Sequence, residues 1–172
     1  GMLWQRSLVM RDLETKTLWS HLLGKGMRGK HEGFNLVMLP GTMTTWGDWK
    51  TRYPKSTLLA MTRTASRYNE ERWQNPRSFL FGIPSQDTRP AISATLAKLQ
   101  NQNVISVEGV VITHQKNGGS VQAFETSVDG TKLTFVPDGD LHMTDRETGT
   151  RWSLVEGKGE SGSLVGKQLQ PV

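Results

Sequence analysis

An acidic pattern that could carry out chemistry occurs twice in this chain. Asp-x-Glu-Thr-x-Thr-x-Trp begins at residue 12 and again at residue 145, so the candidate acidic residues are Asp12, Glu14, Asp145 and Glu147. If the two copies converge, such carboxylates could bind a hard cation such as calcium or magnesium, or act as a general acid and base. They also suit hairpin turns that precede an anchored tryptophan. We favour this structural role, because both copies would need it whatever the function.

The acidic pattern belongs to a longer internal repeat. Residues 8–36 and 141–169 align without a gap, and 14 of the 29 positions are identical. In each copy, β-branched and aromatic residues flank turn formers, which predicts a β-hairpin followed by short strands separated by glycines. A duplication of this kind determines the architecture. We therefore expect Trp19 and Trp152 to share a backbone trace and to be buried alike.

The turns of the two copies differ at one position. Gly149 can supply the positive φ that ends the second hairpin loop, whereas Lys16 stands in its place in the first copy. We therefore expect strain or a different shape in the first turn.

Two helices are predicted between the copies. Thr45 can cap a short helix over residues 45–53, which Pro54 would end, and its three aromatic residues would share one face: Trp46, Trp49 and Tyr53. We favour packing of that face on a sheet over stacking against a sugar. The clearer helix is predicted over residues 91–100, opened by Pro90. Strands are expected at 104–107, 110–113, 120–126 and 131–136.

A long connector over residues 62–90 carries arginines interleaved with aromatic residues. The candidate ligand-binding residues there are Arg63, Arg67, Tyr68, Arg72 and Trp73. Guanidinium groups offer a planar fork of donors, so this segment could hold a small anionic or saccharide ligand. Alternatively, the arginines lie along the surface of the fold, and we favour this interpretation.

The composition excludes several classes of function. The chain has 172 residues, a net charge of +5 and no cysteine, so disulfides, thiolate metal sites and cysteine nucleophiles are excluded. The basic residues are scattered, which does not favour a nucleic-acid partner. No apolar run is long enough for a transmembrane segment. The four histidines lack ligand spacing, no phosphate-binding loop or nucleophile elbow occurs, and no metal or cofactor can be assigned.

The repeated hairpins also carry a resemblance to a known family. Residues 8–20, the Trp-Gly-Asp-Trp helix with Tyr53-Pro54, and residues 145–152 resemble a bacterial family of uncharacterised proteins, domain of unknown function 3179. The resemblance implies no established activity. It implies a longer protein with a Cys-Pro-Leu-Cys motif ahead of the first hairpin, which this chain lacks. Many members look exported, which implies a location in the cell envelope or periplasm.

These patterns predict a mainly β protein at the α+β margin. We expect internally duplicated β-hairpin units forming one compact body, a single domain over residues 1–172. Two functions remain open. We prefer a binding or interaction module whose ligand contacts lie on the connector, because no nucleophile or general base is visible. The alternative is a hydrolase-like or metal-dependent enzyme that uses the paired carboxylates of the two hairpins.

Overall fold

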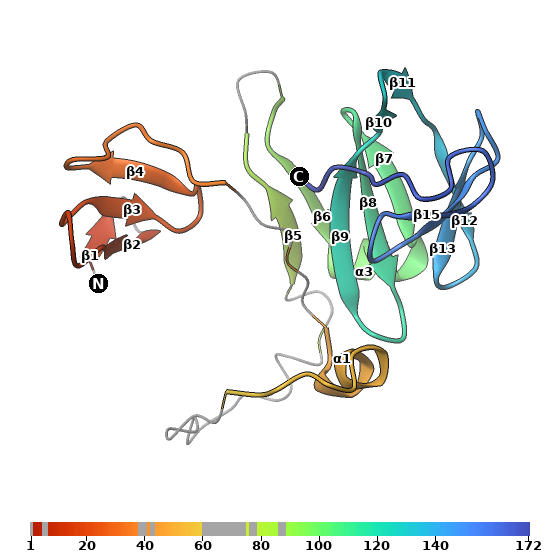
Figure 1. Ribbon diagram of the computed structural model, residues 1–172, viewed down its shortest axis with the longest axis horizontal. Helices are drawn as coiled ribbons and strands as arrows, with labels where there is room; N and C mark the ends of the chain where they lie inside the picture. Colours follow the sequence, from red (N-terminus) through yellow and green to blue (C-terminus); the bar gives the residue numbers. More distant parts are fainter. Residues whose placement is uncertain are drawn as a thin grey trace. The chain divides into compact units, whose positions relative to one another are not determined.

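The computed structural model describes residues 2–4, 7–37, 41, 44–59, 75, 79–85 and 89–172. Antiparallel strands dominate these residues, so the mainly β prediction is confirmed (Figure 1). The chain forms two compact units, Gly1–Pro40 and Gly41–Val172. The extent of the predicted single domain stays a prediction.

The first unit is a four-stranded antiparallel sheet built by the first copy of the repeat. Its strands are β1 (Met2–Trp4), β2 (Ser7–Arg11), β3 (Leu18–Ser20) and β4 (Lys25–Arg28), and they are paired in this order. Lys16, in the turn between β2 and β3, has a φ of 59°. A side chain in this left-handed region costs energy, so the strain predicted for this turn is confirmed.

The second copy builds the same sheet inside the second unit. Its strands, again paired in chain order, are β12 (Phe135–Asp138), β13 (His142–Asp145), β14 (Arg151–Ser153) and β15 (Gly159–Ser161). Met10 pairs with Trp19 in the first copy, and Met143 pairs with Trp152 in the second. The last two strands of each copy pair with a bulge at the same place in the repeat. The predicted shared backbone trace is therefore confirmed.

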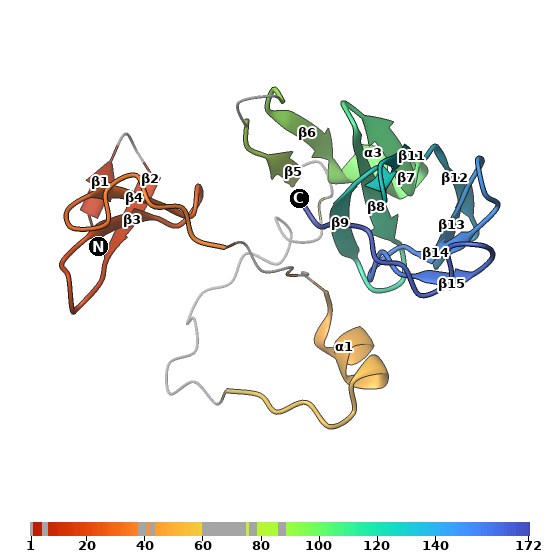
Figure 2. The same ribbon diagram turned by 45° about the horizontal axis from the view of Figure 1, so that its top comes forward.

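A three-stranded sheet forms the centre of the second unit (Figures 1 and 2). Its strands are β7 (Val104–Val107), β8 (Val110–Gln115) and β9 (Ser120–Glu125), close to three of the predicted ranges. Every residue of β8 is buried, because both faces of the sheet are covered. Val111 and Phe124 join the core of the second copy on one face, while Val110 and Ile112 join a second core on the other.

The second core is completed by a hairpin and a short helix. The hairpin pairs β5 (Leu80–Ile83) with β6 (Ile92–Thr95), and the helix is α3 (Leu96–Asn101). A further small hairpin, β10 (Ser127–Val128) with β11 (Thr131–Lys132), follows the central sheet.

The helix predicted from residue 91 begins later than expected, at Leu96. Residues 92–95 form a strand instead, with Ile92 and Ala94 buried and Ser93 and Thr95 exposed. Thr95 then caps the helix, since its hydroxyl accepts a hydrogen bond from the backbone N–H of Lys98.

The other described helix is α1 (Trp46–Arg52), and the predicted cap is confirmed because the Thr45 hydroxyl accepts from the backbone N–H of Asp48. No helix in the described part of the chain is long and apolar enough to cross a membrane.

Candidate functional site

The carboxylate of Asp12 is occupied by its own hairpin turn. One oxygen accepts hydrogen bonds from the backbone N–H groups of Thr15 and Lys16 at 2.5 and 3.1 Å. The other accepts from the Thr15 hydroxyl at 2.7 Å, the Thr17 N–H at 3.0 Å and the Trp19 indole N–H at 2.9 Å. The aspartate therefore closes the turn and fixes the tryptophan ring that follows it.

Asp145 repeats this network in the second copy. Its carboxylate accepts from the Thr148 N–H at 2.6 Å, the Thr148 hydroxyl at 2.9 Å, the Thr150 N–H at 3.2 Å and the Trp152 indole N–H at 2.8 Å. Asp145 is fully buried, whereas Asp12 is half-buried. The two turns are built alike but differ in their exposure to water.

These hydrogen bonds keep both aspartates ionised. Donation from the Thr15 hydroxyl and the Trp19 indole holds the pKa of Asp12 far below its ordinary value of 3.8. Burial raises the pKa of Asp145, but donation from Trp152 and Thr148 outweighs it, so the pKa also lies below the ordinary value. A carboxyl group with a lowered pKa is a poor proton donor near neutral pH, so neither aspartate suits a general acid.

The two glutamates of the acidic pattern lie at the surface. Glu14 is exposed. Glu147 is also exposed, and its carboxylate accepts from the Thr134 backbone N–H at 2.7 Å, which lowers the pKa of Glu147. Among the described residues, no group of three acidic or histidine side chains could hold a metal ion. The four acidic residues are divided between the two units, and their convergence into one site stays a prediction.

The connector candidates lie outside the described residues: Arg63, Arg67, Tyr68, Arg72 and Trp73. The last arginine of the connector, Arg89, is described and is only 7% exposed. It forms an ion pair with Glu125 at 2.9 Å. Arg89 is therefore buried within the fold.

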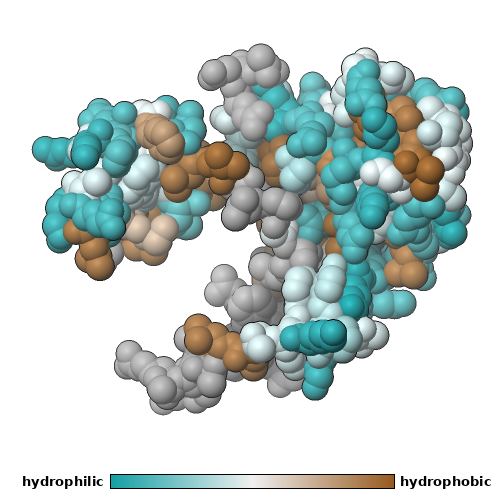
Figure 3. Space-filling model, in the orientation of Figure 1, coloured by the Kyte–Doolittle hydropathy of each residue, from teal (hydrophilic) through white to brown (hydrophobic). Residues whose placement is uncertain are grey.

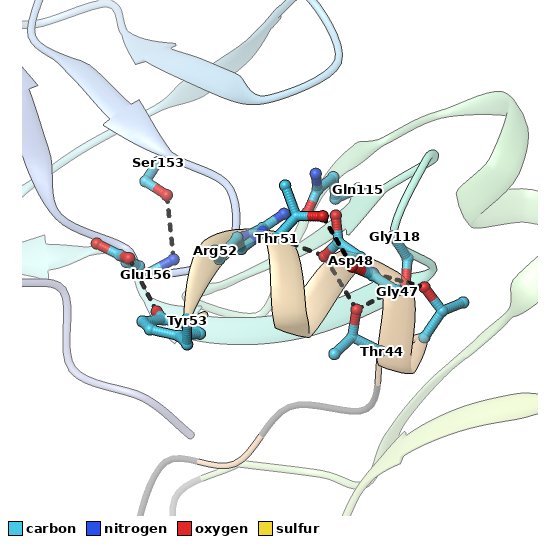
Figure 4. Close-up of polar contacts among 11 residues, drawn as sticks. Thr44, Gly47, Asp48, Thr51, Arg52, Tyr53, Gln115, Gly118, Ser153 and Glu156 are labelled. Atoms are coloured by element: carbon cyan, nitrogen blue, oxygen red, sulfur yellow. Dashed lines mark hydrogen bonds and ion pairs between the residues drawn. The ribbon is translucent and has the colours of Figure 1, made fainter. Parts of the chain in front are cut away.

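Polar contacts hold the N-terminal end of α1 against the loop between β8 and β9 (Figure 4). The Thr44 hydroxyl and the Thr45 backbone N–H both donate to the Gly118 carbonyl, at 2.9 and 3.2 Å. A Cβ atom at Gly118 would lie 2.5 Å from the Asp48 carboxylate. The absence of a side chain at this glycine is what allows the helix to approach so closely.

The C-terminal end of α1 is held in the same way. Arg52 donates to the Gln115 side chain, and the Tyr53 hydroxyl donates to Glu156 at 3.2 Å (Figure 4). Burial, followed by the charge of Glu156, raises the pKa of Tyr53. The aromatic face predicted to pack on a sheet is not buried, because α1 buries none of its residues, and Trp49 instead lies against Tyr53 with ring centroids 4.5 Å apart. A role of this face in sugar stacking stays a prediction.

Comparison with known proteins identifies the family of the chain. A family model described as "Protein of unknown function (DUF3179)" matches residues 1–117 and again residues 101–172. The chain belongs to the DUF3179 family. The second match joins the central sheet β7–β8–β9 to the second copy of the repeat. No curated protein and no solved structure matches this DUF3179 chain.

The two copies in this DUF3179 protein differ most in burial. Four residues of the second copy are at most 1% exposed and lie in the core with Val111 and Phe124 of the central sheet: Met143, Trp152, Leu154 and Leu169. We call the equivalent residues of the first copy the open face: Met10, Trp19, His21 and Leu36. Met10 is 52% exposed, Leu36 is 47% exposed, His21 is exposed and Trp19 is half-buried. The expectation that both tryptophans are buried alike is therefore wrong.

Aromatic contacts within the first copy cover part of Trp19. His31 stacks on the indole with centroids 6.0 Å apart, and Phe34 meets it edge-on at 6.3 Å. Phe34 is itself 57% exposed, so it extends the apolar surface of the open face. Sequence reasoning missed this surface, although one signal was present: His21 stands where the second copy has Leu154. A polar residue at a position that is buried in the other copy indicates a different environment.

Proposed function

We propose that this DUF3179 protein is an interaction module, and that the open face of its first repeat is the binding surface for another protein. One observation carries the proposal. The same backbone, with the same methionine, tryptophan and leucine at equivalent positions, is fully buried in the second copy, whereas in the first the methionine and leucine are exposed and the tryptophan is half-buried. Within the described residues of its own unit, His31 and Phe34 contact Trp19, while Met10 and Leu36 stay about half exposed.

The chemistry of the open face favours a protein partner over a small polar ligand. Met10 and Trp19 are cross-strand neighbours, and Phe34 continues the apolar surface from the indole. Figure 3 shows apolar side chains at the surface of this unit. Exposed apolar patches with polar rims are typical of protein interaction sites, because they leave a hydrophobic driving force unused until a partner covers them.

The carboxylates of the repeats support this proposal over an enzymatic one. Asp12 and Asp145 each accept hydrogen bonds from their own turn, and each fixes the indole that lies on the apolar face of its sheet. We therefore infer that the acidic pattern builds the surface. A ligand of the connector, as well as the envelope location implied by the family resemblance, remain separate predictions.

The proposal is tested by affinity capture from extracts of the source organism. The bait is the full chain, and it is compared with a variant that carries Met10→Asp and Leu36→Asp. A charge on the open face should abolish capture of a specific partner, because a buried and uncompensated carboxylate opposes association. Leu13→Asp is the matched control, since Leu13 is 83% exposed in the turn of the same repeat.

Capture that is lost in the open-face variant and kept in the Leu13 variant supports the interaction module. The proposal is refuted if all three baits retain the same proteins, or if Met10 of the isolated protein resists peroxide as strongly as Met143. The second result would show that the face is already covered.

A further inference from the structure

Resting on this proposed function, we infer that the partner presents an antiparallel sheet of the β7–β9 type, and that it docks on the open face as the central sheet docks on the second repeat. The packing of the central sheet on the second repeat is the pattern for this proposed contact. The inference commits to one occupant, a sheet of this type carried by a DUF3179 protein other than this chain.

The second repeat receives the central sheet through shape and through backbone pairing. Phe124 packs so closely over Gly157 that a Cβ atom there would lie 2.6 Å from the ring. The Thr113 hydroxyl donates to the Leu154 carbonyl at 2.6 Å, and the Glu125 N–H donates to the Gln170 carbonyl at 2.8 Å. The Phe124 ring packed over Gly157 therefore fixes the position of the sheet on the repeat. The residues that follow the repeat, such as Gln170, pair with the edge strand β9.

The first repeat keeps the parts of the docking site that belong to a repeat. Gly24 occupies the place of Gly157, and their φ angles are 59° and 64°. The Leu36 N–H donates to the Gly24 carbonyl at 2.7 Å, and the equivalent bond of the second copy, from Leu169 to Gly157, measures 2.9 Å. Val37, the residue equivalent to Gln170, is 86% exposed. In the second copy, the backbone at this position, Gln170, pairs with β9. The backbone of Val37 is therefore the equivalent pairing point in the first copy.

Both faces of the central sheet of this chain are already covered. Val111 and Phe124 lie in the core with the second repeat, and Val110 and Ile112 lie in the core with β5, β6 and α3. A sheet that covers the first repeat must therefore be an additional one. The family match over residues 101–172 includes both the central sheet and the repeat it covers, so this combination falls within one stretch of family sequence.

The inference is tested by fusing a second copy of the central sheet to the N-terminal side of the first repeat. The two copies are offset by 133 positions, so residues 101–140 correspond to the segment immediately ahead of Leu8. In the test protein a second copy of residues 101–140 replaces residues 1–7 of the full chain. This graft contains no methionine and no tryptophan. The signals of Met10 and Trp19 therefore report on their own surroundings.

The readout is peroxide oxidation of each methionine, followed by peptide mass spectrometry. In the unmodified chain Met10 should oxidise rapidly and Met143 slowly, because only the first is exposed. In the grafted chain Met10 should slow to the rate of Met143 in the same molecule. The matched control carries Asp at the grafted copies of Val111 and Phe124, and should leave Met10 as reactive as in the unmodified chain.

The outcomes separate the inference from the proposed function. If Met10 is reactive in the unmodified chain and equally reactive in the grafted chain, the β7–β9 type of partner is wrong while an interaction face remains supported. If Met10 is protected in the unmodified chain at every protein concentration, both fail. Protection that depends on protein concentration in the unmodified chain would identify a second copy of the chain as the occupant and would also overturn the inference.

Discussion

Replacing the buried turn carboxylate, Asp145→Asn, should destabilise the second unit markedly. An asparagine keeps the shape but has only one acceptor oxygen for the donors of Thr148, Thr150 and Trp152. Its amide group must face at least one N–H or O–H donor, and the remaining bonds lose their charge assistance. A neutral side chain costs less to bury than a charged one, which offsets part of this loss. We therefore expect the free energy of unfolding to fall by about 3 kcal/mol.

Equilibrium urea unfolding, followed by circular dichroism, measures this loss. A change of this size corresponds to a decrease of about 1.5 M in the urea midpoint. Asp12→Asn is the matched control, because the same bonds lie in a half-buried turn where water can replace a lost partner, and its loss should be smaller. Hydrogen exchange of the two units shows which one is affected. Equal losses for the two variants, or an Asp145→Asn protein within about 0.5 kcal/mol of the unmodified chain, would refute the reasoning.

The same variant should change the response to acid. The pKa of Asp145 is lowered in the folded protein, so its stabilising contribution is fully present above the ordinary value of 3.8 and is lost as the pH falls below it. The difference in unfolding free energy between the unmodified chain and Asp145→Asn should therefore narrow below about pH 3.8. Urea midpoints measured between pH 7 and pH 2.5 test this, and a constant difference would contradict it.

Gly157→Ala should lower the free energy of unfolding by about 3 kcal/mol, because its Cβ would lie 2.6 Å from the Phe124 ring and its φ is 64°. The control is Gly166→Ala, because Gly166 has a φ of 81° and a Cβ atom there would have no neighbour within 4 Å. In urea unfolding, its free energy of unfolding should fall by only about 1 kcal/mol. If the connector binds a ligand, Arg67→Ala with Arg72→Ala should reduce the thermal shift produced by an anionic or saccharide compound. The absence of any shift across a broad panel would count against that site.

The local parts of this fold could be predicted from the sequence, because their bonds join residues close in the chain. The aspartate of each turn is at most seven residues from its hydrogen-bond donors, including Trp19 and Trp152. The residue types of the repeat therefore indicate the hairpin directly. The strain at Lys16 could be predicted for the same reason, since the other copy has a glycine at that place in the turn.

The position of the second helix could not be predicted as well, because one segment satisfies two periodicities. Ile92, Leu96 and Leu99 have helical spacing, but Ile92 and Ala94 also alternate with exposed residues as in a strand. Pairing with β5 decides the matter for residues 92–95, and β5 lies within the stretch 62–90 that the sequence indicated only as a connector. Thr95 could have indicated the boundary, because it is a good N-cap residue three positions before Lys98.

The difference in burial between the copies has the same physical origin. The bonds that shape each repeat lie within the repeat, whereas the residues that cover the second copy, such as Val111 and Phe124, come from another sheet. The two repeats therefore form the same sheet although their apolar faces differ in exposure. On the proposed function, the same sheet is a core layer in the second repeat and a binding surface in the first. The acidic turn is compatible with both, because the hydrogen bond from the indole N–H to the aspartate lies within each repeat.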